Sequence, residues 1–420
     1  MPLHDAGMVV RSACAVAVLF AGALLSAQRP STWRCKNVLA KDGASWMQDV
    51  VVTTILDHVI SVKPAEPGEP VDTDFGDAYM IPGLIDLHTH LLLRPYDQRT
   101  WDEQVRTESN ELRAIRAGTH ALQTLRAGFV AVRELGTEGA GAADVALKEA
   151  LAEGLVRGPM VFASTRAIAR RGCYGPDPED PTTKKGAQMV EGVDEIRAAV
   201  RAQAALGADW IKVYADYRHG SKGAVAPTFS RDELVALCDE AAKCKLPVAA
   251  HATTDEGIRN AVEASVRTIE HGAGASEATL SRMKAKGIVL VPCLAANEAI
   301  VRYAGHRGPI VERLNAAKAG FQRALAAGVT IACGSDAGVF AHGENVRELE
   351  LMVEYGMTPE QALRAATSTA AAVLGRTDLG HIGARQSGLV VLTADPLRDI
   401  TALRSVRAVI REGDERWGPR

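Results

Sequence analysis

The chain has 420 residues, of which 47% are hydrophobic and 24% charged, and this globular composition excludes a largely disordered protein. Its 48 basic and 51 acidic residues give a formal net charge of -3, which argues against a nucleic-acid partner and favours a small-molecule one. A chain of this length suits one large domain with a small second unit.

The first 28 residues differ in character from the rest of the chain. From Ala13 to Ala27 no residue is charged, and this apolar run follows Arg11 and ends in small residues. The run is shorter than the roughly 20 residues that a membrane-spanning helix needs. We therefore predict a signal peptide over residues 1–28, export to the periplasm or outside the cell, and no stable membrane insertion after cleavage. An uncleaved anchor or a buried N-terminal helix is the alternative.

Both ends of the remaining chain are rich in β-prone segments. Asp49–Leu56 is typical of the N-terminal end and Ser387–Leu392 of the C-terminal end. Turn residues separate these segments. We predict that residues 29–80 and 381–420 together form a small β-sandwich domain.

The middle of the chain, residues 81–380, alternates short apolar runs with amphipathic helical stretches, which is typical of a parallel sheet. One of these stretches, Asp102–Arg126, has the pattern of a single long helix. Eight such units predict an α/β fold, a (β/α)8 TIM barrel. The eight runs are Gly83–His88, Phe129–Glu134, Met160–Ser164, Trp210–Ala215, Pro247–His251, Arg267–His271, Ile288–Cys293 and Val329–Ser335.

Histidines end three of the predicted strands. In a barrel enzyme the chemistry lies at the carboxyl ends of the strands. His88 and His90 point to the same side because side chains alternate along a strand, while His251 and His271 end the fifth and sixth runs. A single histidine at such a position is usually structural. Four imidazoles from three strands at one rim instead predict a metal site.

Two further positions suit metal chemistry. Asp336 follows the eighth run, where a carboxylate can bind an ion and take a proton from a metal-activated water; a helix-capping role is the alternative. Lys212 lies within a strand, where a buried ammonium group is costly, so an outward position is its alternative. Beside two cations its neutral amine could react with carbon dioxide to give an anionic, bridging carbamate. Zinc suits such ligands, although manganese, iron or cobalt sites would look the same.

The cysteines beyond the predicted signal peptide show no paired metal-binding spacing. We predict that most of them are small core or surface residues, with one or two disulfide bridges in an oxidising compartment as the alternative. They are Cys35, Cys173, Cys238, Cys244, Cys293 and Cys333.

The ordered motifs resemble those of the amidohydrolase superfamily, and within it the prolidase-like and Xaa-dipeptidase-like branch. The resemblance covers about residues 35 to 415. It is carried by Ile81–His90, Lys212, His251-Ala252, His271-Gly272 and Gly334–Ala337. It implies two divalent ions: His88 and His90 bind the more buried one, His251 and His271 bind the second, carboxylated Lys212 bridges both, and Asp336 is ligand and base. Relatives are often homo-oligomers.

Substrate contacts are less well defined than metal ligands. Tyr214 shares the inward face with Lys212, and relatives have a substrate-contacting tyrosine there, so Tyr214 joins Asp336 and His271 as a predicted catalytic residue. Relatives often carry a Gly-His pair after the third strand, whereas this chain has Arg170–Pro176. An arginine suits a substrate carboxylate. The predicted substrate contacts are Tyr214, Arg94, Arg171, Tyr174, Arg218 and His342, with Arg166 and Arg170 as further clamp candidates.

These features predict hydrolysis of an amide or peptide bond next to a free carboxylate, in dipeptides, N-acyl amino acids or ochratoxin-like aryl amides. The second hypothesis is a cyclic amide or lactone hydrolase of the imidazolonepropionase type. Lys212 argues against it, because mononuclear ring-opening relatives commonly lack the bridging lysine. The third hypothesis is an exported binding protein that has kept the barrel without turnover.

Overall fold

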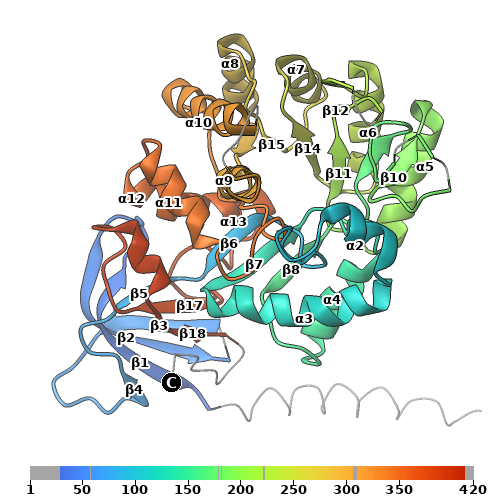
Figure 1. The fold of residues 1–420 in the computed structure, drawn as a ribbon. Helices are drawn as coiled ribbons and strands as arrows, with labels where there is room; N and C mark the ends of the chain where they lie inside the picture. The colour runs from blue at the N-terminus through green and yellow to red at the C-terminus, as the bar shows by residue number, and fades with distance from the viewer. Residues whose placement is uncertain are drawn as a thin grey trace, which may run out of the picture.

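A computed structural model describes residues 29–56, 58–177, 179–180, 182–220, 223–305 and 310–411 (Figure 1). The predicted signal peptide lies outside the described residues. Within these ranges, no helix combines the length and the apolar character that crossing a membrane requires.

Strands from both ends of the chain form one seven-stranded sheet, drawn in blue and red in Figure 1. The strand order is β18-β17-β5-β1-β2-β3, and β4 pairs with β1. The sandwich predicted from the two ends is one hydrogen-bonded sheet, because β5 pairs with both β1 and β17. The strands are β1 (Ser31–Leu39), β2 (Trp46–Ile55), β3 (His58–Pro64), β4 (Thr73–Asp74), β5 (Tyr79–Pro82), β17 (Leu389–Leu392) and β18 (Val406–Ile410).

The middle of the chain contains two parallel sheets, ordered β6-β7-β8 and β10-β9-β11-β14-β15-β16. Four strands, β6, β7, β11 and β16, are buried along their whole length. This burial is expected for a parallel sheet that is covered on both faces. The strands are β6 (Leu84–Thr89), β7 (Phe129–Glu134), β8 (Met160–Ala163), β9 (Ile168–Arg170), β10 (Gln188–Val190), β11 (Ile211–Tyr214), β14 (Val248–Ala252), β15 (Thr268–His271) and β16 (Val289–Val291). A separate hairpin joins β12 (Asp216–Arg218) to β13 (Val225–Pro227).

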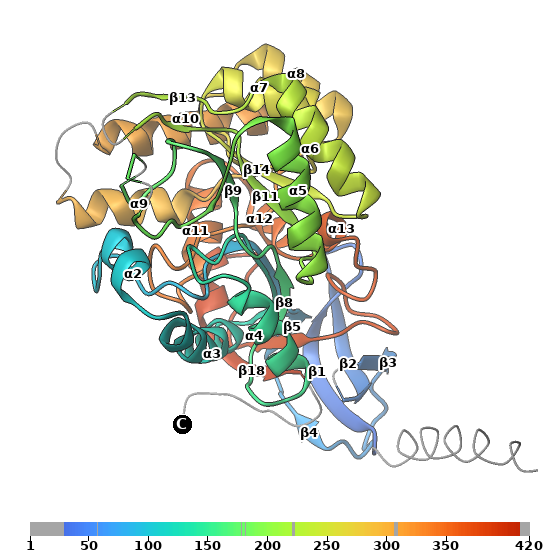
Figure 2. The ribbon, with the colours of Figure 1, turned by 90° about the vertical axis from the view of Figure 1, so that its right-hand side faces the viewer.

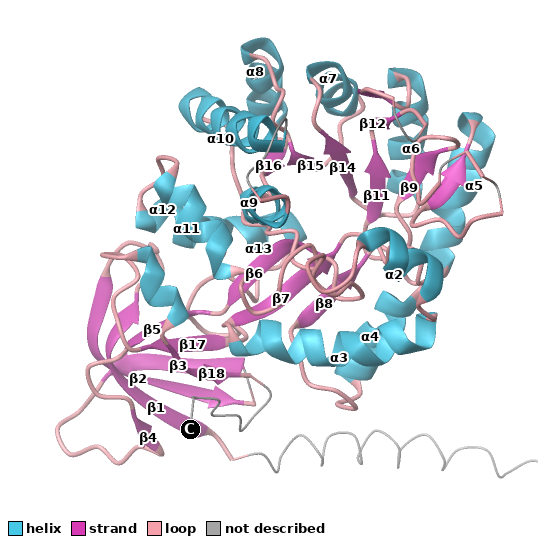
Figure 3. Ribbon diagram, in the orientation of Figure 1, coloured by secondary structure: helices cyan, strands magenta, loops and turns pink. Residues whose placement is uncertain are grey.

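Helices surround the parallel strands on the outside (Figures 2 and 3). They are α2 (Trp101–Thr107), α3 (Asn110–Arg126), α4 (Ala143–Ala152), α5 (Gly192–Ala205), α6 (Arg231–Lys243), α7 (Asp255–Glu263), α8 (Glu277–Lys286), α9 (Leu294–Tyr303), α10 (Ile310–Ala327), α11 (Val346–Glu354), α12 (Pro359–Ala365) and α13 (Ser368–Leu374), with a 3-10 turn over Ile400–Arg404.

The single helix predicted over Asp102–Arg126 is wrong, because the structure has two helices there. Glu108 adopts an extended conformation that ends α2. Ser109 then caps α3, since its side chain accepts a hydrogen bond from the Leu112 N–H.

The eighth predicted strand, Val329–Ser335, is not a regular strand in the structure. Only Ile331 forms a bridge, with Leu290 of β16. The segment still lies between β16 and β6, because Ala332 N donates to Leu290 O and Leu87 N donates to Cys333 O, each at 2.9 Å. It thereby links the two parallel sheets on one side.

The opposite side of the two sheets is joined less completely. Ala163 O at the end of β8 accepts hydrogen bonds from Asp209 N and Trp210 N, just before β11. Among the described residues, no strand ladder connects β8 to β9. The α/β class is confirmed, while closure of an eight-stranded barrel and the proposed domain boundaries stay predictions.

Candidate metal centre

His88, His90 and Asp336 meet at the carboxyl end of β6. Asp336 Oδ1 lies 3.7 Å from His88 Nε2 and 3.2 Å from His90 Nε2. All three side chains are buried, and Asp336 has the largest exposed fraction, at 8%. Two imidazole nitrogens and one carboxylate oxygen from distant parts of the chain therefore face one point.

The other ring nitrogen of each histidine is bound by the protein. His88 Nδ1 lies 2.9 Å from Glu270 Oε2, and His90 Nδ1 lies 2.8 Å from Gly136 O. A carboxylate and a carbonyl oxygen accept hydrogen bonds, so Nδ1 donates in both cases and Nε2 is left for a metal. Both rings are thus oriented for ligation.

Glu270 is itself held by buried groups. Arg133 Nη2 and Thr268 Oγ1 donate to Glu270 Oε1 at 2.9 and 2.5 Å. Arg133 and Glu270 are fully buried, and such a pair is tolerated when its hydrogen bonds are complete. This pair was not predicted, although the sequence carries a signal for it, because each is a charged residue within an apolar strand run.

His251 and His271 lie beside this first group. Their ring centroids are 4.6 Å apart, and the His271 ring centroid lies 5.6 Å from that of His88. His271 has a positive φ of 69° and is followed by Gly272, so the chain turns sharply at the end of β15. Its Nδ1 is buried without a hydrogen-bond partner among the described residues.

Lys212 is buried at 1% exposure in the middle of β11. Its Nζ lies 5.6 Å from the centre of the Tyr214 ring. Within the ranges that the structure describes, no carboxylate forms an ion pair with this amine. Lys212 therefore does not occupy the outward position that is usual for a lysine in a strand.

Asp336 is fixed through the neighbouring Ser335. The buried Asp86 carboxylate accepts hydrogen bonds from Ser335 N at 3.0 Å and Ser335 Oγ at 2.5 Å. Asn345 Nδ2 donates to the same carboxylate at 2.7 Å, and His88 N does so at 3.0 Å. This network connects β6 to the segment before Asp336, so both sides of the first group are held together.

We call His88, His90, Lys212, His251, His271 and Asp336 the metal cluster, because they are the predicted metal ligands. The electrostatics of this cluster favour the neutral form of three of its four imidazoles. Burial lowers the pKa of His88 and of His251 well below the usual value, and it lowers the pKa of His271 to about 4. His90 differs: burial opposes its charge, but the hydrogen bond with Asp336 raises its pKa to about 9. Burial likewise opposes the Asp336 charge, yet the His88 and His90 imidazoles lower its pKa.

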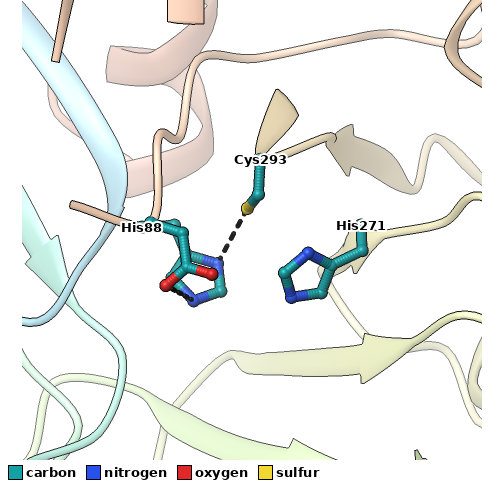
Figure 4. A group of neighbouring side chains, drawn as sticks. His88, His271 and Cys293 are labelled. Carbon is teal, nitrogen blue, oxygen red and sulfur yellow. Dashed lines mark hydrogen bonds and ion pairs between the residues drawn. The ribbon is translucent and has the colours of Figure 1, made fainter. Parts of the chain in front are cut away.

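Cys293 is a member of the cluster that the sequence analysis did not assign to it. Its Sγ lies 3.2 Å from His88 Nδ1, and Figure 4 shows it with His271 around the His88 ring. The ligand atoms of His88, His271, Cys293 and Asp336 lie within 4.8 Å of one another. Cys293 is a buried residue, as predicted for most of the cysteines, and it lies beside the predicted ligands because β16 pairs with β15.

Tyr214 lies at the edge of the metal cluster, within an aromatic group. Its ring centroid is 4.9 Å from that of His251, and its hydroxyl donates to Tyr174 Oη at 2.8 Å. Tyr174 in turn donates to Glu138 Oε2 at 2.7 Å, as does Trp101 Nε1 at 2.9 Å. Glu138 is a buried carboxylate with a positive φ of 49°, and the sequence analysis did not single it out.

Two of the arginines predicted to contact substrate are paired with carboxylates. Arg94 Nη2 lies 2.8 Å from Glu108, and Arg171 Nη2 lies 2.9 Å from Glu195. Arg171 lines a cavity of about 730 Å³ that includes none of the predicted metal ligands. Arg166 also lines this cavity. Neither Arg94 nor Arg171 is therefore placed as a free clamp at the metal cluster.

The remaining residues that were predicted to contact substrate lie in different surroundings. Arg170 lies 3.8 Å from each of two carboxylates and donates to a backbone carbonyl, and Arg218 is an exposed residue of β12. His342 is buried behind the site, with its ring stacked on His120 at 4.1 Å and its Nε2 2.9 Å from Leu93 O. The structure thus places His342 outside the cluster that holds His88.

The donor set fits divalent metal ions. Imidazole nitrogens and a carboxylate are typical ligands of zinc and related ions. The first group has both of its imidazoles oriented by hydrogen bonds, and His271 Nδ1 has no partner within the described chain. A buried polar atom without a partner needs an explanation, and a cation supplies one.

Comparison with known proteins places this geometry in a family. The amidohydrolase family model matches residues 79–415. An ochratoxinase from Aspergillus niger is 30% identical over 371 residues, which cover 79% of this chain and 73% of that protein. The chain belongs to the amidohydrolase family and is a hydrolytic enzyme.

Solved structures of similar proteins agree with this assignment. A Xaa-Pro dipeptidase with methionine bound in its active site superposes with a TM-score of 0.80 at 27% identity, covering 92% of this chain and 99% of that one. A prolidase complexed with N-methylphosphonate-L-proline gives the same TM-score, identity and coverage. The resemblance inferred from the motifs is therefore confirmed.

Proposed function

We propose that this enzyme is a binuclear metal-dependent hydrolase that cleaves an amide or peptide bond next to a free carboxylate. Its substrates are dipeptides or N-acyl amino acids. The observation that carries the proposal is the convergence of four imidazoles, one carboxylate and a buried lysine from five segments of the chain. We also propose that the parallel strands close into an eight-stranded barrel, with the segment from Val329 as the eighth member.

The proposed ligands divide into two sets. His88 and His90 hold the first ion, His251 and His271 hold the second, and Asp336 completes the first set. Bound divalent ions acidify a water molecule and polarise the scissile carbonyl. Zinc is the ion that this donor set suits best.

Lys212 is proposed to bridge the two sets as a carbamate. The neutral amine adds to the carbon of carbon dioxide, so that an N–C bond forms and one proton leaves to solvent. Burial lowers the pKa of the Lys212 amine, which increases its neutral fraction. The product carries a negative charge between two proposed cation sites, whereas an ammonium there would be repelled.

Asp336 and Tyr214 have separate proposed roles. Asp336 takes the proton of the attacking water and returns it to the leaving amine, which its position beside His88 and His90 supports. Tyr214 orients the substrate, because its ring lies next to His251 and its hydroxyl is positioned by Tyr174. His271 lies between these two groups and is proposed to contact the reacting carbonyl.

The similar proteins support the proposed substrate class. Methionine and the N-methylphosphonate of L-proline, bound in two of them, are both amino acid units with a carboxylate. The relative named ochratoxinase supports aryl amides as a further candidate.

The proposal is tested with metal-loaded protein. We expect elemental analysis to find two ions per chain, and a screen of dipeptides and N-acyl amino acids to find hydrolysis. The matched control is each substrate with its carboxylate converted to a carboxamide, which we expect to react more slowly. A protein that holds two ions and cleaves none of these compounds would contradict the substrate class while leaving the metal centre intact.

A further inference from the structure

Arg313 lies in the first turn of α10 and is connected to the metal cluster by hydrogen bonds. Its Nε donates to Asn297 Oδ1 at 2.7 Å, and Asn297 Nδ2 donates to Cys293 O at 2.9 Å. Asn297 is 4% exposed, so this anchor is fixed in the protein interior. Cys293 Sγ lies 3.2 Å from His88 Nδ1, so the residue that holds the anchor also contacts a predicted metal ligand.

The charge of Arg313 reaches buried groups from several elements. Burial is the main cause of the lowered pKa of His251 and of His271, and the positive charge of Arg313 contributes to both. Burial raises the pKa of Tyr96 and of Tyr217, and the charge of Arg313 opposes this. These four side chains come from separate segments, and the ring centroids of Tyr217 and His251 lie 5.8 Å apart.

Arg313 also differs from the arginines that were predicted as clamps. Among the described residues it forms no ion pair, whereas Arg94 and Arg171 are paired with carboxylates. Asn297 engages only its Nε, so Nη1 and Nη2 are left for a ligand. Arg313 and Arg218 are both exposed. No side chain in the described ranges anchors Arg218 by a hydrogen bond, whereas Asn297 anchors Arg313.

We propose that Arg313 binds the free carboxylate of the substrate through Nη1 and Nη2. The planar guanidinium matches two carboxylate oxygens, and the bond to Asn297 restricts its motion before the substrate arrives. Arg313 is thereby the residue that selects substrates with a free carboxylate. This inference rests on the proposed hydrolysis and adds to it the group that recognises the acid.

The test compares Arg313→Gln, Arg313→Lys and Arg302→Gln in the metal-loaded enzyme. Arg302 is an exposed arginine of the preceding helix α9 whose guanidinium packs on Tyr303, so its variant makes the same charge change without removing the bond between Arg313 and Asn297. Each variant is assayed on a substrate as the free acid and as the carboxamide. Thermal unfolding of each variant verifies that folding is unchanged.

We expect Arg313→Gln to lower kcat/KM for the free acid by roughly 10- to 150-fold, the range for a hydrogen bond to a charged group. The carboxamide reaction should change little, so the preference for the acid is lost. Arg313→Lys should restore part of the preference, because lysine keeps the charge without the fork. Calorimetry with the product amino acid should show the same order of affinities, and Arg302→Gln should match the unmodified enzyme.

The two proposals fail in different ways. If the unmodified enzyme hydrolyses neither form of any tested substrate, the proposed function is wrong. If it prefers the free acid and Arg313→Gln keeps that preference and the product affinity, the function stands and the assignment of Arg313 is overturned. Loss of the preference in Arg218→Gln, with Arg313→Gln unaffected, would overturn it in favour of Arg218.

Discussion

The two sides of the metal cluster are organised differently. On the β6 side, His88 and His90 each have a hydrogen-bond acceptor for Nδ1, and Asp86 fixes the chain before Asp336. On the β15 side, His271 Nδ1 has no partner within the described chain. Lys212 likewise has no carboxylate partner there.

This difference indicates that the protein orients the first set of ligands in advance, whereas His271 and Lys212 would depend on the proposed second ion and carbamate. Ligand orientation by hydrogen bonds strengthens metal binding. The second ion should therefore be the more easily removed. Substitutions in each set of ligands and in the groups behind them should separate the two sides.

Lys212→Ala should have the largest effect, because it removes the proposed bridge from both sides at once. We expect loss of the second ion and a fall in kcat of more than about 10⁴-fold, above the range of general acid–base catalysis alone. A short free carboxylic acid, such as formate or propionate, should restore part of the activity. Activity and metal content that survive in Lys212→Ala would exclude the bridge.

Asp336→Asn should keep most of the shape of the site while removing its proton acceptor. A general base contributes roughly 10²- to 10⁴-fold, so kcat should fall by that factor. Rapid kinetics with equal metal loading separates this loss from loss of ions. Unchanged kcat in Asp336→Asn would show that another group takes the proton.

Glu270→Gln should weaken the β6 side selectively. The partner of a metal-binding histidine contributes roughly 10- to 100-fold to metal affinity, and we expect a loss of that size at the first site. Competition with a chelator measures it. The matched control is Glu263→Gln, which changes a surface ion pair with Arg282. Equal affinities in the two variants would show that Glu270 does not support ligation.

The smallest effect concerns the His120 and His342 stack behind the cluster. Burial lowers the pKa of His120 to about 4, below an unfolded value of about 6.5. Between these values the unfolded chain binds a proton that the folded chain does not, so stability falls as the pH falls. His120 should contribute roughly 2 kcal/mol to the decrease in the free energy of unfolding between pH 7 and pH 5.

Urea unfolding of the unmodified protein and of His120→Gln at both pH values measures this contribution. The difference between the two proteins cancels the metal-binding histidines, which titrate in both. An identical pH dependence in the two proteins would show that His120 titrates normally in the folded state.

Much of the cluster could be predicted from the sequence, because strand periodicity determines which side chains share a face. His88 and His90 follow this rule, and the parallel register brings Tyr214 level with His251. The break at Glu108 was missed because the helical pattern continues on both sides of it. The eighth segment is irregular although its sequence is apolar. Its Gly334 lies where a Cβ would be 2.2 Å from Val291 Cγ1 and 3.0 Å from His88 Cβ.

The substrate contacts were the least predictable part. An arginine clamp was expected in the loops directly after the strands, yet Arg94 and Arg171 have carboxylate partners that only tertiary packing reveals. Arg313 lies in a helix and becomes a candidate only through its bond to Asn297. Cys293 similarly joins the cluster because β16 ends beside β15, which no cysteine spacing indicates.

The most direct test of the two-ion centre is a crystal structure of metal-replete protein with anomalous scattering at the edge of the bound metal. We expect one peak between His88, His90 and Asp336, a second between His251 and His271, and density for a carbamate joining Lys212 to both. A single peak, or none, with an unmodified Lys212 amine would contradict the proposed binuclear centre.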